Sequence, residues 1–225
     1  MITIDPKIYS RYPGFHCAWM TVTNAGQTAD RPALDLLKGE GIRQLKKQHA
    51  GYERSSFIRT EPVCRYVQYY KSFGRTYPVL QQLESILLKD KGLPAVGALI
   101  EAMFLAEVQN LLLTAGHDRN CLQGKLNLQT ADGTETYHGI TGKEQQLTAG
   151  DLCISDECGI LSSILGGPDQ RTKITADTKD VLYFVYGVDG VTKEQLSRHL
   201  EMIAACLGTV IPEAQIGPVM LPAGT

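Results

Sequence analysis

Gly116-His117-Asp118 places a histidine directly beside a carboxylate, an arrangement that can carry out proton transfer. A histidine next to an aspartate can act as a general base or orient a water molecule. The same pair can instead close a helix C-terminus, where a cation meets the negative end of the helix dipole. The surrounding pattern predicts that the pair follows a long helix and precedes a strand. His117 and Asp118 are therefore the candidate catalytic residues.

A second group of candidate residues lies in the run GILSSILGGPDQRTKIT, residues 159–175. Gly166 and Gly167 follow an apolar strand, and glycine lets the backbone take positive φ or approach another group closely. Hydroxyl and cationic side chains flank the turn: Ser162, Ser163, Arg171 and Thr172. Buried hydroxyls need partners, and an arginine can pair with a carboxylate or a phosphate. The run predicts either a pocket for a small polar ligand or a tight turn beside a braced loop.

Several common enzyme signatures are absent from the sequence. It contains no GxSxG elbow, no GxxxxGK[ST] phosphate loop, no HExxH helix and no GxGxxG fingerprint. Their absence argues against common hydrolases, P-loop enzymes and Rossmann oxidoreductases. The six cysteines show no CxxC spacing. We therefore expect free thiols, no metal centre and a reducing, cytoplasmic compartment.

The elements that must position these residues follow from the hydrophobic pattern. Strands are expected where β-branched and aromatic residues dominate, and helices where apolar residues recur every three or four positions. The pattern predicts helices at 31–50, 62–73, 79–88 and 96–114, and one that begins with the capping box Thr192–Gln195 and ends at Gly208. It predicts strands at 15–23, 152–155, 160–165 and 181–186, and a hairpin with Asp132-Gly133 between two short strands.

This order of elements predicts the fold class. Helices come first, then a strand-rich block and a closing helix, which indicates a single α+β domain over residues 1–208. Residues 209–225 contain three prolines and no lysine or arginine, and we expect an extended C-terminal tail. The N-terminus has no signal-peptide pattern, and the apolar segment 95–116 is interrupted by charged residues, so no membrane span is expected.

Several runs, taken in order, resemble the tRNA-editing domain of the bacterial phenylalanyl-tRNA synthetase β subunit. The chain resembles still more closely the freestanding proteins that consist of that domain alone. Three runs are similar to the freestanding proteins: YYKSFGR at 69–75, KGLP at 91–94 and RTK at 171–173. The apolar helix ending in AGHD at 115–118 lies where the freestanding proteins have such a helix and the synthetase has a turn that contains a histidine and an aspartate. ILGG at 164–167 resembles the synthetase's Ile-Met-Gly-Gly. The resemblance covers about residues 5–207.

The resemblance implies a hydrolase that acts in trans on aminoacyl-tRNA and removes a wrongly attached amino acid, with no cofactor and no metal. It implies a pocket in which Gly166 and Gly167 admit the aminoacyl group. The implied substrate-binding set is Ser162, Ser163, Gly166, Gly167, Arg171, Thr172 and Phe184. The basic segment 38–59, with Lys46, Lys47 and Arg54, is either a tRNA contact or a solvated helix face. The chain lacks the parts of a complete aminoacyl-tRNA synthetase.

Two positions depart from the synthetase pattern. The strand 181–184 has no counterpart of the glutamate that reads the tyrosine hydroxyl, which indicates a different amino acid. His117 directly precedes Asp118, whereas the synthetase histidine lies three residues before its aspartate. Two other functions stay open. The missing glutamate favours a non-catalytic RNA-binding module, and the net charge of −2 favours a protein that binds a free amino acid or similar metabolite.

Overall fold

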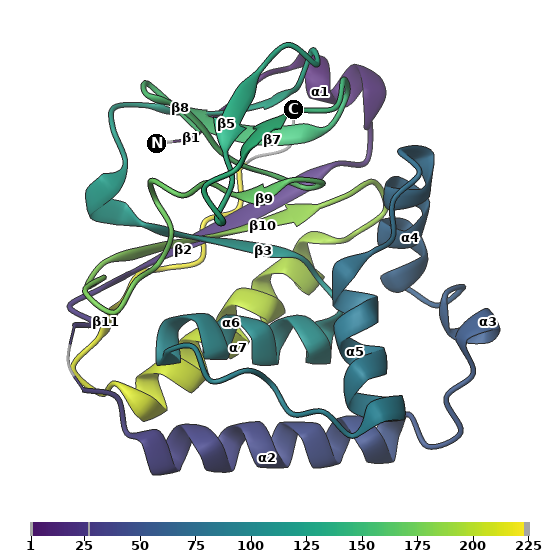
Figure 1. Cartoon of the computed structure of the whole chain (residues 1–225), viewed down its shortest axis with the longest axis vertical. Coiled ribbons are helices and arrows are strands. Elements are labelled where there is room, and N and C mark those ends of the chain that lie inside the picture. Colours follow the sequence, from purple (N-terminus) through teal and green to yellow (C-terminus); the bar gives the residue numbers. More distant parts are fainter. Residues whose placement is uncertain (1, 27, 223–225) are drawn as a thin grey trace.

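A central sheet separates a layer of helices from a second β layer (Figure 1). The computed structural model describes residues 2–26 and 28–222. The central sheet has the strand order β11 (Gln215–Ile216), β2 (His16–Thr23), β10 (Val181–Gly187) and β3 (Thr114–Asp118). All of its neighbouring strands are antiparallel. Because β10 lies in the middle and is buried along its whole length, this sheet forms the centre of the molecule.

The second sheet lies on the other side of the central sheet from the helices (Figure 1). Its order is β1 (Ile2–Ile4), β4 (Leu126–Thr130), β7 (Leu152–Asp156), β8 (Gly159–Ser163) and β9 (Gly167–Pro168). β1 and β4 are parallel, and the other neighbours are antiparallel. A separate ribbon pairs β5 (Thr136–His138) with β6 (Glu144–Gln146). The turn between β8 and β9 contains Gly166 and leads directly into Gly167, the first residue of β9.

The long helices cover the opposite face of the central sheet. They are α2 (Arg31–Gln48), α5 (Pro78–Lys89), α6 (Ala98–Asn110) and α7 (Lys193–Val210). The shorter elements are α1 (Lys7–Arg11), α3 (Arg54–Phe57), α4 (Val63–Ser72) and the 3₁₀ turn η1 (Arg119–Cys121). α6 and α7 pack together beneath the sheet, and α2 packs across both of them (Figure 1). The α+β prediction is confirmed.

The helix boundaries reflect local capping and the burial of apolar faces. At the start of α7, Thr192 and Gln195 form the expected capping box, which satisfies two backbone amides. Asp30 caps α2 by accepting a hydrogen bond from the amide of Ala33 at 3.0 Å. All six cysteines are free thiols, as their spacing predicts. None of the helices in residues 2–26 and 28–222 combines the length and apolar character needed to cross a membrane.

The predicted helix over residues 96–114 is too long. α6 ends at Asn110, because Leu111 takes a left-handed conformation with φ of 57°. The chain then turns and forms β3, which begins at Thr114. Gly116-His117-Asp118 therefore lies inside a strand, and the prediction of a loop at this position is wrong. Alternate side chains of a strand face opposite sides, so the strand directs His117 and Asp118 apart.

Two further predictions need correction. β4 and β5, which flank Asp132-Gly133, do not pair with each other; β4 pairs with β7 and β5 pairs with β6. The glycine still makes a turn, with φ of 95°, but that turn connects two different sheets. The closing helix α7 continues through Gly208 to Val210. In the tail, β11 pairs with β2, and residues 223–225 lie outside the described residues.

A buried ionic cluster holds the start of α6 against α2. Glu101 is fully buried. It accepts hydrogen bonds from Arg31 at 2.7 Å, from Lys38, and from the amides of Val96 and Gly97 at 2.9 and 3.0 Å. Burial alone would raise the pKa of Glu101, but these donors outweigh it and lower the pKa to about 2. The cluster fixes where α6 begins.

We predict that Glu101→Gln lowers the free energy of unfolding by roughly 3 kcal/mol, because it leaves the buried Lys38 ammonium without its counter-ion. Urea denaturation at pH 7 measures the change. Glu40→Gln on α2 is the control, because Glu40 and Arg43 form an exposed pair 3.9 Å apart, and it should cost less than about 1 kcal/mol. Equal effects of the two substitutions would contradict the anchoring role of Glu101.

Candidate functional site

The main candidate site is a pocket of about 490 Å³ between α5, α6, β3 and the β8–β9 turn. A volume of this size is typical of small-molecule sites. Its walls are largely apolar and include Val79, Ile100, Met103, Phe104, Leu165 and Ile174. Elements from both sides of the central sheet line it, so the pocket exists only in the assembled fold.

The two glycines of the β8–β9 turn both line the pocket, for different reasons. A Cβ atom on Gly166 would lie 2.3 Å from the Tyr137 hydroxyl and 2.9 Å from Ser163 Oγ. Gly167 has φ of 73°, where side chains are strained, and a Cβ there would meet no atom within 4 Å. Gly166 is thus required by the approach of Tyr137, and only Gly167 presents bare backbone to open space.

Side chains from other elements fix the backbone of this turn. Tyr70 of α4 donates a hydrogen bond to the carbonyl of Ile164 at 2.6 Å. The amide of Leu165 donates to the Asp151 carboxylate at 3.1 Å, and Tyr137 donates to the carbonyl of Gly167 at 2.9 Å. Because buried backbone groups need partners, these bonds hold the turn in one conformation.

The polar end of the pocket is formed by Glu107 of α6 and Thr114 of β3. Glu107 is only 4% exposed, and its Oε1 accepts a hydrogen bond from the Thr114 amide at 2.8 Å. Within residues 2–26 and 28–222, no other hydrogen-bond donor contacts this carboxyl group. Burial raises the pKa of Glu107 to about 8, against the smaller lowering effect of the Thr114 amide.

Two cationic side chains, Arg75 and Lys173, also line the pocket. Arg75 is exposed and lies just after α4, at a second hollow that Arg54 and Lys71 also line. Neither Arg75 nor Lys173 forms an ion pair with the residues that the structure describes. The pocket thus offers two cations and a buried carboxyl group to a ligand that carries both an anionic group and a polar head.

His117 lies outside this pocket, in a fully buried hydrogen-bond chain. Thr172 donates its hydroxyl proton to Asp169, so it accepts from His117 Nδ1 at 2.8 Å. His117 Nε2 then accepts from Ser162 at 3.1 Å, and Ser162 lies 2.8 Å from the Tyr186 hydroxyl. Burial and the nearby Arg171 lower the pKa of His117 to about 4, so the imidazole is neutral at pH 7.

This hydrogen-bond chain contains a serine, a histidine and an acid, but Thr172 stands between His117 and Asp169, and the serine cannot meet a substrate. Ser162 is fully buried and does not line the pocket, whereas its neighbour Ser163 does. Asp118 is not a partner of His117. Its carboxylate accepts hydrogen bonds from the amide of Asn120 at 2.9 Å and from the Thr178 hydroxyl at 2.7 Å. The predicted pair therefore stabilises the packing of β3 against neighbouring loops.

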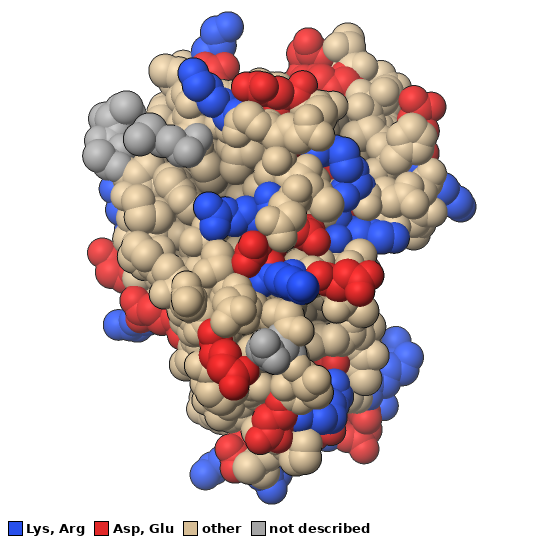
Figure 2. Space-filling model, turned by 90° about the vertical axis from the view of Figure 1, so that its left-hand side faces the viewer, with Lys and Arg blue, Asp and Glu red and all other residues tan. Residues whose placement is uncertain are grey.

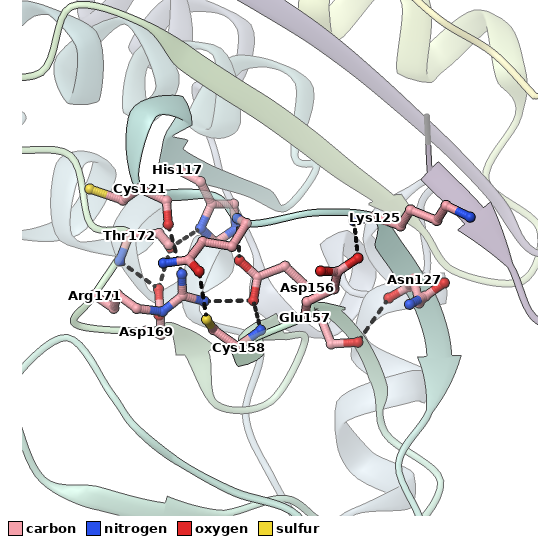
Figure 3. A network of polar contacts seen from close by, with 12 residues as sticks. His117, Cys121, Lys125, Asn127, Asp156, Glu157, Cys158, Asp169, Arg171 and Thr172 are labelled. Carbon is pink, nitrogen blue, oxygen red and sulfur yellow. Dashed lines mark hydrogen bonds and ion pairs between the residues drawn. The ribbon is translucent and has the colours of Figure 1, made fainter.

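Arg171 and Thr172 brace the loop that follows β9. Figure 3 shows the Arg171 guanidinium between Asp156 and Asp169, and it forms an ion pair of 2.8 Å with Asp156 and one of 3.7 Å with Asp169. Arg171 also donates to the carbonyl of Cys121 at 2.7 Å. Neither Arg171 nor Thr172 lines the main pocket. Of the two alternatives for Arg171, its contacts match the bracing of a loop.

Phe184 is fully buried in β10 and does not line the pocket. Its ring packs edge-on against Tyr186, with ring centroids 4.7 Å apart, and Tyr186 does line the pocket. Within residues 2–26 and 28–222, no group of three or more His, Cys, Asp or Glu side chains lies close enough to hold a metal ion.

The predicted tRNA contacts lie on α2 and α3, outside the pocket. Lys46 forms an ion pair with Asp90, and Arg54 forms one with Glu84; Lys47 is exposed. Figure 2 shows one face of the molecule, on which lysine and arginine side chains alternate with aspartate and glutamate. The cations that line the pocket are better placed to meet a charged ligand than the paired Lys46 and Arg54.

Sequence reasoning missed the side chains that give the pocket its polarity. Arg75 lies in the YYKSFGR run and Lys173 in the RTK run, so both were inside recognised motifs without an assigned role. Glu107 interrupts an apolar helix, and a charge at a core position could have indicated a site. Thr114 gave no such indication, because its place in a strand depends on the helix ending at Asn110.

Comparisons with known proteins agree on one relationship. The B3/4 domain family matches residues 65–205. A phenylalanine–tRNA ligase beta subunit of Tropheryma whipplei is 38% identical over 68 residues, which are 29% of this chain and 7% of that protein. The corresponding subunit of Mycoplasma genitalium is 26% identical over 82 residues, or 36% of this chain and 10% of that protein.

A solved structure shares the fold. An N-terminal fragment of the phenylalanyl-tRNA synthetase beta subunit from Pyrococcus horikoshii matches with a TM-score of 0.52 and 12% identity. The match covers 96% of this chain and 50% of that fragment. At this level of identity the likeness concerns the fold alone.

We predict that Glu107→Gln changes how stability depends on pH. Because folding raises the pKa of Glu107 from 4.5 to about 8, the folded state binds more protons than the unfolded state between these values. Wild-type stability should therefore fall relative to the variant as pH rises through this window, by about 1.4 kcal/mol per pH unit. Urea denaturation of both proteins at pH 5.5 and 7.5 measures this change in the difference between their free energies of unfolding. A constant difference would contradict a buried, neutral carboxyl group.

Proposed function

The chain belongs to the B3/4 domain family, and from this premise we propose that it binds the aminoacylated 3′ end of a tRNA and hydrolyses the ester of a wrongly attached amino acid. The observation that carries the proposal is the pocket between α6 and the Gly166-Gly167 turn. It combines apolar walls, a buried carboxyl group and two cations that have no ion-pair partner among residues 2–26 and 28–222.

The arrangement of charge in this pocket supports an aminoacyl-nucleotide ligand. The amino acid enters between the apolar walls, where Ile100, Phe104 and Leu165 exclude water from its side chain. Arg75 and Lys173 bind the phosphates next to the tRNA 3′ end, because cations pair strongly with phosphate oxygens. The volume of about 490 Å³ holds an amino acid and part of the terminal nucleoside.

The hydrolytic step needs little dedicated chemistry. A water molecule attacks the ester carbonyl carbon, the bond to the 3′ oxygen breaks, and free amino acid and tRNA leave. An aminoacyl ester is already activated, so positioning the water and stabilising the oxyanion account for most of the catalysis. The exposed backbone at Gly167 lies where the ester meets the turn.

A second candidate function is tRNA binding without hydrolysis. One observation favours this function: no histidine from residues 2–26 and 28–222 lines the pocket, and His117 is fully buried. A chain of this kind would bind aminoacyl-tRNA and leave its ester intact. The same pocket would serve both functions, so a kinetic experiment is needed to separate them.

We predict that the protein deacylates one or a few members of a panel of mischarged tRNAs. The double variant Arg75→Ala/Lys173→Ala should lower kcat/KM by about 100-fold or more, because each charge-assisted contact to phosphate contributes roughly 1.5–3 kcal/mol. Gly167→Val should abolish activity, because valine cannot take the φ of 73° at this position without strain and the turn would shift. Release of radiolabelled amino acid measures the rates, and circular dichroism confirms that each variant folds.

Lys7→Ala is the matched control, because Lys7 is an exposed cation on α1 that does not line the pocket. Its kcat/KM should equal that of the wild type. Saturable tRNA binding with no deacylation of any panel member would replace the hydrolase proposal by the binding function. Full activity in the Arg75/Lys173 double variant would contradict the placement of the tRNA end at this pocket.

A further inference from the structure

Glu107 stands out among the buried charged groups because its carboxyl group faces the pocket with a single partner. Glu101, also on α6, is surrounded by two cations and two amides. Glu107 receives only the Thr114 amide from the residues that the structure describes. A buried carboxyl group without further partners is costly, and such groups are usually satisfied by water, a ligand or a change of protonation.

The hydroxyl group beside Glu107 has a proton to donate. His199 of α7 lies behind Thr114, with Nε2 2.6 Å from Thr114 Oγ1 and Nδ1 3.3 Å from Asn110 Nδ2. An amide nitrogen can only donate, so Nδ1 accepts, and Asn110 also donates to Met202 Sδ at 3.4 Å. The proton of the neutral imidazole is then on Nε2 and bonds to Thr114 Oγ1. The Thr114 hydroxyl keeps its own proton for another acceptor.

Burial makes this polar end neutral at pH 7. It lowers the pKa of His199 to about 3 and raises that of Glu107 to about 8. A neutral carboxyl group both donates and accepts hydrogen bonds, as does a threonine hydroxyl. A cationic ligand would have to draw the proton from Glu107, whereas a hydroxyl or primary amide matches both groups without any change of charge.

We propose that Glu107 and Thr114 form the specificity end of the pocket and select an amino acid whose side chain carries a neutral hydroxyl or amide. The inference rests on the proposed function, since it concerns the amino acid that enters the same pocket. Apolar pockets discriminate poorly between isosteric side chains, whereas a site with buried polar groups strongly rejects an analogue that leaves them unpaired. Ile100, Met103 and Leu165 would contact the rest of the side chain.

The test uses adenosine analogues in which a 3′ amide replaces the ester, so that nothing is hydrolysed. Two isosteric pairs are compared by calorimetry: threonyl with valyl, and glutaminyl with methionyl. We expect the polar member of at least one pair to bind 10- to 100-fold more tightly to the wild type. Glu107→Leu should abolish or reverse this preference, and Glu107→Gln should retain part of it.

Glu144→Gln is the control, because Glu144 is an exposed carboxylate in β6 that does not line the pocket, and it should keep the full preference. Thermal unfolding confirms that the variants fold. Equal binding of both members of each pair, tighter binding of a lysyl analogue, or an unchanged preference in Glu107→Leu would overturn the inference and leave the proposed function standing. Failure of every analogue to bind would overturn the proposed function itself.

Discussion

The hydrogen-bonded anchoring of the β8–β9 turn is the constraint on which the pocket depends. Tyr70 from α4, Asp151 and Tyr137 each satisfy a backbone group between Ile164 and Gly167. These donors and acceptors come from separate parts of the chain, and each can reach the turn only when the layers are assembled. The close approach of Tyr137 removes room for any side chain at Gly166, so the turn has one conformation and the pocket has a fixed wall.

The distribution of charge follows from how deeply each group is buried. His117 and His199 are fully buried, and desolvation lowers the pKa of each, so both act as neutral hydrogen-bonding groups inside the protein. The same desolvation raises the pKa of Glu107, which therefore provides a neutral carboxyl group at the pocket. The cations Arg75 and Lys173 line the same pocket without ion-pair partners in the described part of the chain. The pocket therefore combines two cations with a neutral carboxyl group.

Local sequence signals predicted the helices and strands, whereas contacts between residues far apart in the sequence determine the site. The capping box at Thr192 and the apolar run of β10 depend on neighbouring residues, so both were predictable. The end of α6 was not predictable, because Leu111 takes a left-handed conformation that its residue type does not indicate. That error placed His117 in a loop. The Gly166-Gly167 turn was recognised from its glycines, but Glu107 lines the same pocket only through tertiary packing that no spacing in the sequence encodes.

The proposed function requires that the aminoacyl group binds between α6 and the Gly166-Gly167 turn. A crystal structure of the protein with a 3′-aminoacylamino adenosine analogue tests it most directly. We expect the amino acid between Phe104 and Leu165, with its side chain directed at Glu107 and the adenosine toward Arg75 and Lys173. An analogue bound elsewhere, for example beside Lys46 and Lys47 on α2, with the pocket empty at saturating concentration, would contradict the claim.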